Sequence, residues 1–247
     1  MNAPPGPACP PSWRAEVEQV RGGSEDDFAR THDLSLDEYR RQARQRIIEL
    51  VDRKQLRIRM LEGQLATFIA ERRFKNYFEG GETTGVKDKG LRRKVESRTL
   101  GVSESAQGED RPIYGYLQGS LENHHELKPH GSIIVVLKPE VTERATIVFG
   151  DTIGSTNDAE LAVFAPDDLR QPTLLCSYAY RDPLLAAVLG DAVDPVFGFA
   201  ELQIYGGISD HDIAYIFFCK GEEPDETTMT HLEQAEIRYR LQSDYPA

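Results

Sequence analysis

The sequence predicts an α+β protein in which a helical region at residues 35–110 precedes a strand-rich domain at residues 111–247. In the first region, apolar residues recur every three or four positions, which is the period of a helix face. The second region contains short runs of β-branched and aromatic residues with turn residues between them. Helical segments fall between these runs without strict alternation, which favours α+β over a doubly wound parallel sheet.

Residues 1–34 are expected to form a disordered arm. Five prolines fall between Met1 and Pro11, and a Gly-Gly pair and an acidic cluster at residues 25–27 follow. This composition lacks the apolar residues that a core requires. The arm also has no positively charged start and no continuous apolar stretch, so it lacks the pattern of a cleavable secretory signal.

The helical region is expected to begin at Ser35. Ser35 and Glu38 have the capping-box spacing, in which a hydroxyl and a carboxylate satisfy each other's backbone donors. Apolar positions from Leu36 to Phe68 then predict an amphipathic helix of about 35 residues, with room for one break at residues 52–55.

A second, shorter helix is expected around residues 90–100. The segment 101–110 that follows is polar and rich in Ser, Gly and acidic residues, as connectors are. We therefore place the boundary between the helical region and the strand-rich domain at residue 110.

Six segments of the strand-rich domain have the composition of β-strands. They are residues 113–117, 132–138, 145–149, 173–180, 199–205 and 214–219. Short helices are expected among them. Two are predicted to start at capping boxes, Asn157 with Glu160 and Thr230 with Glu233, and a third is expected from Asp182 to Gly190.

The composition excludes several classes of protein. The formal net charge is −12 and the pI is about 5.0, which argues against a general nucleic-acid binder and a polybasic membrane sensor. No apolar run approaches the roughly 20 residues of a membrane helix. The three cysteines are far apart and fit neither a disulfide framework nor a zinc pattern, so a reducing compartment is expected.

The net charge is unevenly distributed along the chain. Residues 38–73 carry 10 basic and 5 acidic side chains, whereas residues 111–247 carry 9 basic and 22 acidic ones. A solvated helix face is the ordinary interpretation of such a basic segment. The alternative is that basic helix 38–73 contacts the acidic domain or an acidic partner, and covers a cleft there together with the Pro-rich arm.

Common catalytic and metal-binding motifs are absent, including the P-loop, the dinucleotide fingerprint and the zinc-protease and nucleophile-elbow motifs. His124, His125 and His130 lie in a polar segment, but adjacent side chains point apart and no cysteine stands nearby. We interpret the segment as an exposed loop and expect no metal site.

Three segments of the strand-rich domain are candidates for a functional cleft. They are residues 111–115, 145–156 and 197–207. In the last of these, Glu201 and Gln203 share one face of an otherwise apolar strand because side chains alternate. Such polar groups are costly to bury without partners. The alternative for Glu201 is an edge-strand carboxylate paired with an arginine.

The sequence motifs in and before these segments also resemble those of a known protein family. The run from Arg73 to Leu117, with its Phe-Glu-Gly-Gly and Arg-Pro-Ile-Tyr-Gly motifs, resembles a family of bacterial proteins. That family is related to the C-terminal parts of some phage head-morphogenesis (Mu F-like) proteins and is similar to ADP-ribosyltransferase toxins. The later motifs Val-Leu-Lys-Pro-Glu-Val, Gly-Asp-Thr and Glu-Leu-Gln-Ile-Tyr-Gly-Gly extend the resemblance to about Cys219.

The resemblance implies a split β-sandwich ADP-ribosyltransferase-like domain with NAD as its substrate. It implies that Glu201 is the catalytic carboxylate and that Arg111 meets the pyrophosphate, whose oxygens suit a guanidinium. The other residues of the implied NAD site are Tyr114, which would stack on nicotinamide, Gly115, Thr152 or Ser155, which would hold Glu201, and Gln203.

Two departures from the toxin pattern matter. The toxins usually carry Ser-Thr-Ser on their second element, where this chain has Gly-Asp-Thr and Gly-Ser-Thr. They also carry Glu or Gln two positions before the catalytic Glu, where this chain has Phe199. Because that position helps to orient the acceptor, we do not expect an arginine-modifying activity.

The function implied is that of an NAD-dependent mono-ADP-ribosyltransferase-like bacterial effector or toxin. We expect its acceptor to be a macromolecule, protein rather than nucleic acid, and we expect no membrane partner. The protein would be cytoplasmic or delivered without a cleavable signal. The alternatives are a non-catalytic interaction or phage-structure-associated protein that retains the fold, and an RNA-cleaving toxin, against which the acidic domain argues.

Overall fold

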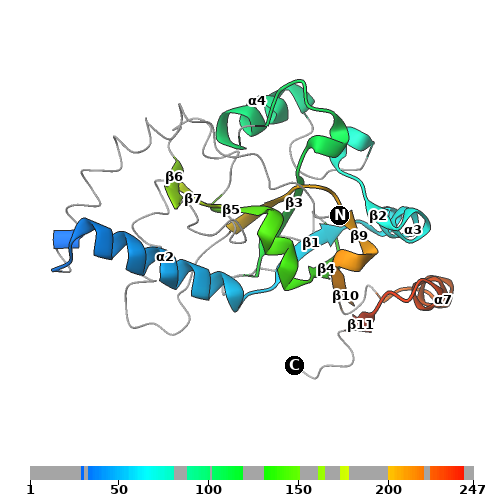
Figure 1. Cartoon of the computed structure of the whole chain (residues 1–247). Coiled ribbons are helices and arrows are strands. Elements are labelled where there is room, and N and C mark those ends of the chain that lie inside the picture. Colours follow the sequence, from blue (N-terminus) through cyan, green and yellow to red (C-terminus); the bar gives the residue numbers. More distant parts are fainter. Residues whose placement is uncertain are drawn as a thin grey trace.

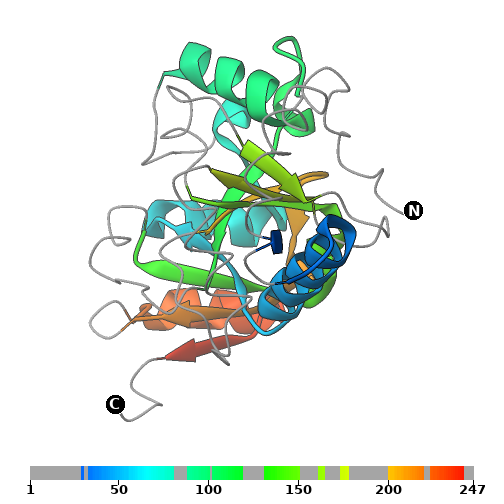
Figure 2. The same ribbon diagram turned by 90° about the vertical axis from the view of Figure 1, so that its left-hand side faces the viewer.

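The structure is a computed structural model. It describes residues 29–30, 33–80, 88–100, 102–118, 131–150, 161–164, 173–177, 200–219 and 223–241. Figure 1 shows a central sheet with helices above and below it, and Figure 2 shows the same arrangement from the side.

A nine-stranded sheet forms the centre of the molecule. The strands lie across it in the order β11 (Tyr239–Leu241), β10 (Ile213–Phe218), β4 (Ile133–Leu137), β1 (Leu56–Met60), β3 (Ile113–Leu117), β8 (Ala200–Ile204), β5 (Ala145–Phe149), β7 (Thr173–Ser177) and β6 (Leu161–Phe164). The β10–β11 and β5–β7 pairs are parallel and the other pairs are antiparallel. A two-stranded sheet joins β2 (Arg73–Phe74) to β9 (Ile208–Ser209).

The described helices are α2 (Leu36–Asp52), α3 (Glu62–Glu71), α4 (Lys89–Leu100) and α7 (Glu226–Gln234). Short 3₁₀ turns occur at Tyr77–Glu79, Gly108–Asp110, Pro139–Arg144 and Asp210–Asp212. The mixture of helices with a largely antiparallel sheet confirms the predicted α+β class.

Strand β1 corrects the prediction of one long helix. Its Leu-Arg-Ile-Arg-Met sequence places alternate residues Leu56, Ile58 and Met60 in the main core, whereas Arg57 and Arg59 are not part of that core. This alternation has period two, but the same apolar residues also fit steps of three and four when the flanking helices are included. The expected break at residues 52–55 is therefore the end of α2 and the entry to a strand.

The position of β1 also contradicts the description of residues 35–110 as a purely helical region. β1 pairs with β3 on one side and with β4 on the other. The sheet therefore extends across the predicted boundary at residue 110, because a strand from before it lies between two strands from after it.

The main core fills the space between α2 and one face of the sheet. Ile47 and Leu50 of α2 belong to the same buried cluster as Ile58, Ile147 and Leu202 of three strands. Helix α4 lies on the other side of the sheet from α2, as both views show (Figures 1 and 2). The polar side chains of the candidate site lie on that second face.

The ends of two helices test the capping predictions. Ser35 is the N-cap of α2, and its hydroxyl accepts a hydrogen bond from the Glu38 backbone N–H at 3.3 Å. Helix α7 instead begins after Asp225, and Thr230 lies inside it with its hydroxyl donating to the Glu226 carbonyl. The predicted start at Thr230 is wrong because Asp225 accepts from the Thr228 N–H and caps the helix earlier.

The predicted helices at Asn157–Glu160 and Asp182–Gly190, most of the N-terminal arm and the histidine-rich segment lie outside the described residues. Within the described part, residues 38–73 contact the acidic half of the chain chiefly through β1 in the sheet. Arg72 adds an ion pair with Asp210 at 2.5 Å. No helix among the described residues is long and apolar enough to cross a membrane.

Candidate functional site

Two rows of side chains lie across the face of the sheet beneath α4. In one row Tyr114 of β3 is opposite Gln203 of β8, and Gln203 is opposite Thr146 of β5. In the next row Glu201 lies between Tyr116 and Val148. Residues two apart on a strand share a face, so the two rows form one surface.

Glu201 and Gln203 interact as their predicted common face requires. The Gln203 side-chain amide donates to Glu201 Oε2 at 2.9 Å. Gln203 is fully buried, whereas Glu201 is partly exposed. Buried Gln203 thus holds the partly exposed Glu201 carboxylate. The Oε1 atom of Gln203 has no hydrogen-bond partner among the described residues.

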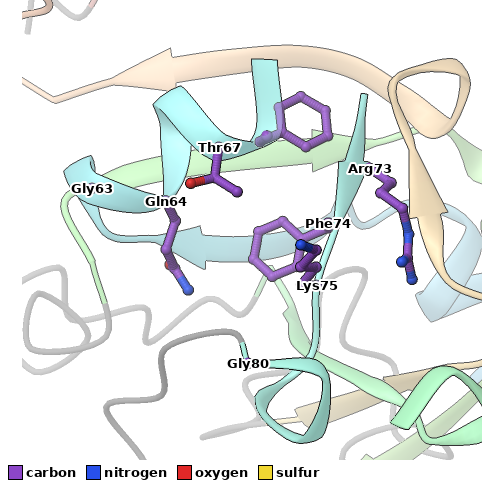
Figure 3. A pocket seen from close by; sticks show the side chains of 8 residues that line it. Gly63, Gln64, Thr67, Arg73, Phe74, Lys75 and Gly80 are labelled. Atoms are coloured by element: carbon purple, nitrogen blue, oxygen red, sulfur yellow. The ribbon is translucent and has the colours of Figure 1, made fainter. Parts of the chain in front are cut away.

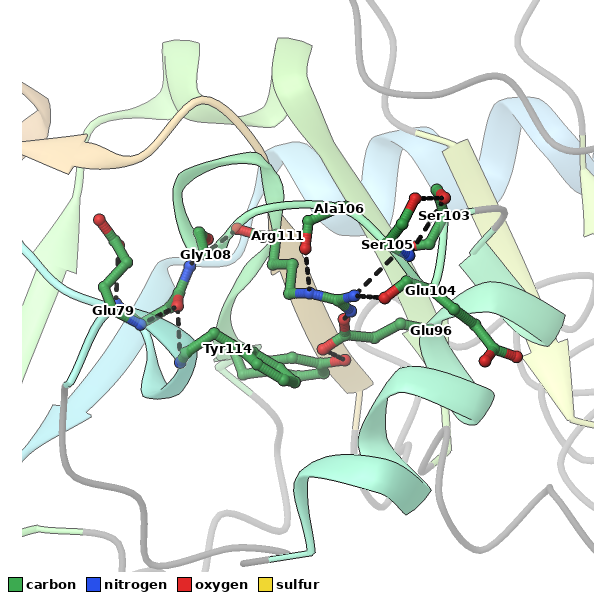
Figure 4. A network of polar contacts seen from close by, with 11 residues as sticks. Glu79, Glu96, Ser103, Glu104, Ser105, Ala106, Gly108, Arg111 and Tyr114 are labelled. Atoms are coloured by element: carbon green, nitrogen blue, oxygen red, sulfur yellow. Dashed lines mark hydrogen bonds and ion pairs between the residues drawn. The ribbon is translucent and has the colours of Figure 1, made fainter.

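Glu96 was not among the predicted site residues, although it is the centre of the polar network in this layer. It comes from α4, is 0% exposed, and forms an ion pair with Arg111 at 2.5 Å. The Tyr114 hydroxyl donates to its other carboxylate oxygen at 3.1 Å. Figure 4 shows Glu96 between the two side chains. Little in the sequence indicates that Glu96 is buried, because a single acidic residue in a basic helix has the pattern of a surface residue.

Burial dominates the electrostatics of this network. It raises the pKa of Glu96 above the usual range, although Arg111 and the Tyr114 hydroxyl oppose the shift. Burial, together with the nearby charges of Glu96 and Glu201, raises the pKa of Tyr114 well above its usual value. Tyr114 therefore remains a neutral hydrogen-bond donor at ordinary pH.

Arg111 does not have the environment that pyrophosphate binding requires. It is 1% exposed, and besides Glu96 its guanidinium donates to the backbone carbonyls of Ala106, Ser103 and Glu104 (Figure 4). The Phe78 ring covers it at 4.4 Å. Because these groups already use most of its donors, Arg111 stabilises the 96–111 segment instead of facing a ligand.

Gly115 has a packing role in this structure. A Cβ atom at this position would lie 2.5 Å from the Arg57 carbonyl oxygen of β1. Glycine is therefore needed for the close approach of β3 to β1. Thr152 and Ser155, the hydroxyl residues implied to hold Glu201, lie outside the described residues.

Arg92 is a second residue that the sequence did not single out. It projects from α4 onto the aromatic rings of Tyr114 at 4.7 Å and Tyr77 at 5.6 Å. Only 8% of its surface is exposed, and no residue in the described part of the chain forms a hydrogen bond with its Nε atom. The sequence does not distinguish Arg92 because its helix contains several other basic residues.

A separate pocket of about 180 Å³ lies between α3 and β2. Figure 3 shows the Phe74 ring at its centre. The cations at its rim are engaged, Arg73 with Glu79 and Lys75 with Glu71. Glu201, Gln203 and Tyr114 are not among its lining residues, so this pocket is distinct from the polar layer beneath α4.

The chain matches no protein-family model and no curated protein sequence. In the described part of the chain no group of three or more histidine, cysteine or acidic side chains is arranged to hold a metal ion.

The arrangement supports one kind of chemistry directly. A partly exposed carboxylate, held in place by an amide and bordered by a neutral tyrosine, can stabilise positive charge that develops on a bound ligand. Glu201, Gln203 and Tyr114 form this group on two adjacent strands.

Proposed function

We propose that the protein is an NAD-dependent mono-ADP-ribosyltransferase-like enzyme in which Glu201 is the catalytic carboxylate. The observation that carries the proposal is the hydrogen bond from buried Gln203 to Glu201, which fixes a partly exposed carboxylate on the sheet face beside Tyr114. The sequence resemblance around these residues supplies NAD as the donor. The finer fold type, a split β-sandwich of the transferase kind, is part of the same proposal.

The proposed reaction breaks the bond between ribose C1′ and the nicotinamide nitrogen. The electron pair of that bond leaves with nicotinamide, and positive charge builds up on the ribose. Glu201 stabilises this charge and accepts a hydrogen bond from a ribose hydroxyl. A nucleophilic atom of the acceptor, a protein or water, then bonds to C1′ and loses its proton to solvent.

Two other residues have supporting roles in this proposal. Gln203 orients Glu201, because its amide donates to the carboxylate from a fully buried position. The Tyr114 hydroxyl is held by Glu96, and because the Arg92 guanidinium lies 4.7 Å from the ring centre, nicotinamide would stack on the opposite ring face. Thr152 or Ser155 remains the proposed hydroxyl partner of Glu201.

One observation favours a second candidate function. The arginine that the resemblance assigns to pyrophosphate binding is enclosed in a buried ion pair. A protein that retains the fold as a non-catalytic interaction module needs no accessible arginine at that position. This candidate predicts no turnover of NAD.

The test is nicotinamide release from NAD by the purified full-length chain. Replacing Glu201 by Gln keeps the shape of the side chain but removes its charge. Loss of transition-state stabilisation of this kind lowers rates by about 10²–10³-fold. Glu109→Gln is the matched control, since Glu109 is an exposed carboxylate on a 3₁₀ turn and should leave the rate unchanged. Equal rates for the wild type and Glu201→Gln would favour the non-catalytic candidate.

A further inference from the structure

Arg92 lacks the acidic partner that a buried arginine normally has. Its guanidinium lies close to two tyrosine rings, its exposure is 8%, and its Nε is buried without a hydrogen-bond partner among the described residues. It forms no ion pair with a described carboxylate. Its positive charge acts on the carboxyl of Glu96, whose pKa it lowers, but that carboxylate is already paired with Arg111.

The other two buried arginines of the described chain have hydrogen-bond acceptors for their guanidinium groups. Arg111 is saturated by Glu96 and three carbonyl groups, and Arg59 donates to the Gly131 carbonyl at 3.4 Å. A buried cation is costly unless an anion or several acceptors compensate it. Arg92 therefore points to an anion supplied from outside the described chain.

A second cation lies one helical turn before Arg92. The Lys89 ammonium is 4.8 Å from the centre of the same Tyr77 ring, and its residue is exposed. Residues three apart in a helix are neighbours on its surface. Lys89 and Arg92 thus form a two-cation site around Tyr77 that opens to solvent at Lys89.

The N-terminus of α4 does not itself supply this site. The Asp88 carboxylate accepts from the backbone N–H groups of Gly90 at 2.8 Å and Leu91 at 3.0 Å. Those donors are therefore occupied. The attraction for an anion arises from the Lys89 and Arg92 side chains.

We propose that Lys89 and Arg92 bind a phosphate-type anion. A guanidinium presents paired N–H donors that match two phosphoryl oxygens, and an ammonium adds a point charge. The Tyr114 and Tyr77 rings, whose centres lie 4.7 Å and 5.6 Å from the guanidinium carbon, add cation–π attraction that holds the Arg92 side chain in place. Arg92 on α4 thereby takes the anion-binding role that the resemblance assigned to Arg111, which is enclosed by its own partners.

The site adjoins the proposed catalytic layer. Tyr114, which stacks under Arg92, is the cross-strand neighbour of Gln203, and Gln203 binds Glu201. If the proposed function is correct, the anion is the diphosphate of NAD, and this identification alone rests on that function. Free phosphate or pyrophosphate offers the same chemistry to the two cations.

The experiment is a titration of the full chain with inorganic pyrophosphate, and separately with NAD, at constant ionic strength by calorimetry. Arg92→Gln should weaken pyrophosphate binding by about tenfold or more, the loss expected for charge-assisted hydrogen bonds. Lys89→Gln should weaken it less, because Lys89 is exposed. The matched control is Arg93→Gln, the same charge change at the next residue, which is exposed and stacks on Phe78 instead.

Three results would overturn the site. They are an absence of pyrophosphate binding, equal losses in Arg92→Gln and Arg93→Gln, or a pyrophosphate affinity unchanged by Arg92→Gln. Thermal unfolding of the ligand-free variants checks that each protein is folded, so that a loss of pyrophosphate binding reports on the side chain that was replaced.

The outcome also separates this site from the proposed function. Arg92-dependent pyrophosphate binding without nicotinamide release would retain the anion site and reject the enzyme. Arg92-dependent binding of NAD as well as pyrophosphate identifies a nucleotide as the source of the anion, whereas binding of pyrophosphate alone identifies a free phosphate. Nicotinamide release that is unaffected by Arg92→Gln would reject the diphosphate of NAD as the anion while retaining the enzyme.

Discussion

Glu96 connects most of the unusual side chains beneath α4. One of its carboxylate oxygens binds Arg111 and the other accepts from Tyr114. Its carboxylate is surrounded by the protein, so both the ion pair and the hydrogen bond are shielded from water. Removing one partner therefore leaves the other group buried without compensation.

Arg111→Met should accordingly destabilise the protein by about 3–5 kcal/mol, because it leaves the Glu96 carboxylate buried and unpaired. The free energy of unfolding in urea measures this. Arg41→Met is the matched control: Arg41 pairs with Glu38 on the exposed side of α2, and its loss should change stability by less than about 1 kcal/mol. The double variant Arg111→Met/Glu96→Gln should recover part of the loss. Equal effects of the two single arginine variants would contradict the structural role given to Arg111.

Strands β8 and β1 show how far the sequence could predict the elements. In β8, the alternation of Ala-Glu-Leu-Gln-Ile predicts that Glu201 and Gln203 share one face, and their hydrogen bond confirms this. β1 was missed because five residues between two helices supply too few positions to separate period two from period 3.6. Its central place in the sheet depends on pairing with β3 and β4, which are distant in sequence.

Gly115 is a residue at which the pairing of β3 with β1 is sensitive to substitution. Gly115→Ala should destabilise the protein by about 1–3 kcal/mol, since its Cβ would overlap the Arg57 carbonyl oxygen and push β3 from β1. Gly63→Ala in α3 is the matched control. Nothing lies within 4 Å of a Cβ there, so alanine should stabilise by about 0.4–1 kcal/mol. Chemical denaturation of both variants measures the difference, and a loss of stability in Gly63→Ala alone would contradict the packing described.

At the scale of the whole molecule, the chain folds around one sheet that draws strands from both predicted regions. The sequence predicted the α+β class and six of the strands after residue 110, because their apolar runs are local signals, but it missed β6, β9 and β11. It could not assign Arg111 to a buried pair or identify Arg92, because both depend on where α4 lies against the sheet. Burial of a charged side chain is a tertiary property that spacing alone does not reveal.

A fragment of residues 111–247 should therefore fail to fold, although the sequence predicts it as a separate domain. Without β1, strands β3 and β4 would lose their shared neighbour at the centre of the sheet. Circular dichroism and cooperative thermal unfolding test this. A fragment of residues 29–247, which retains every described element, is the control. Cooperative unfolding of the 111–247 fragment would contradict the account of β1.

The most direct test of the central claim is the initial rate of nicotinamide release from NAD by the wild-type chain and by Glu201→Gln, measured side by side with both proteins shown to be folded. The account predicts release by the wild type and a rate about 10²–10³-fold lower in the variant. No release by the folded wild type, or equal rates in the two proteins, would contradict the assignment of Glu201 as the catalytic carboxylate.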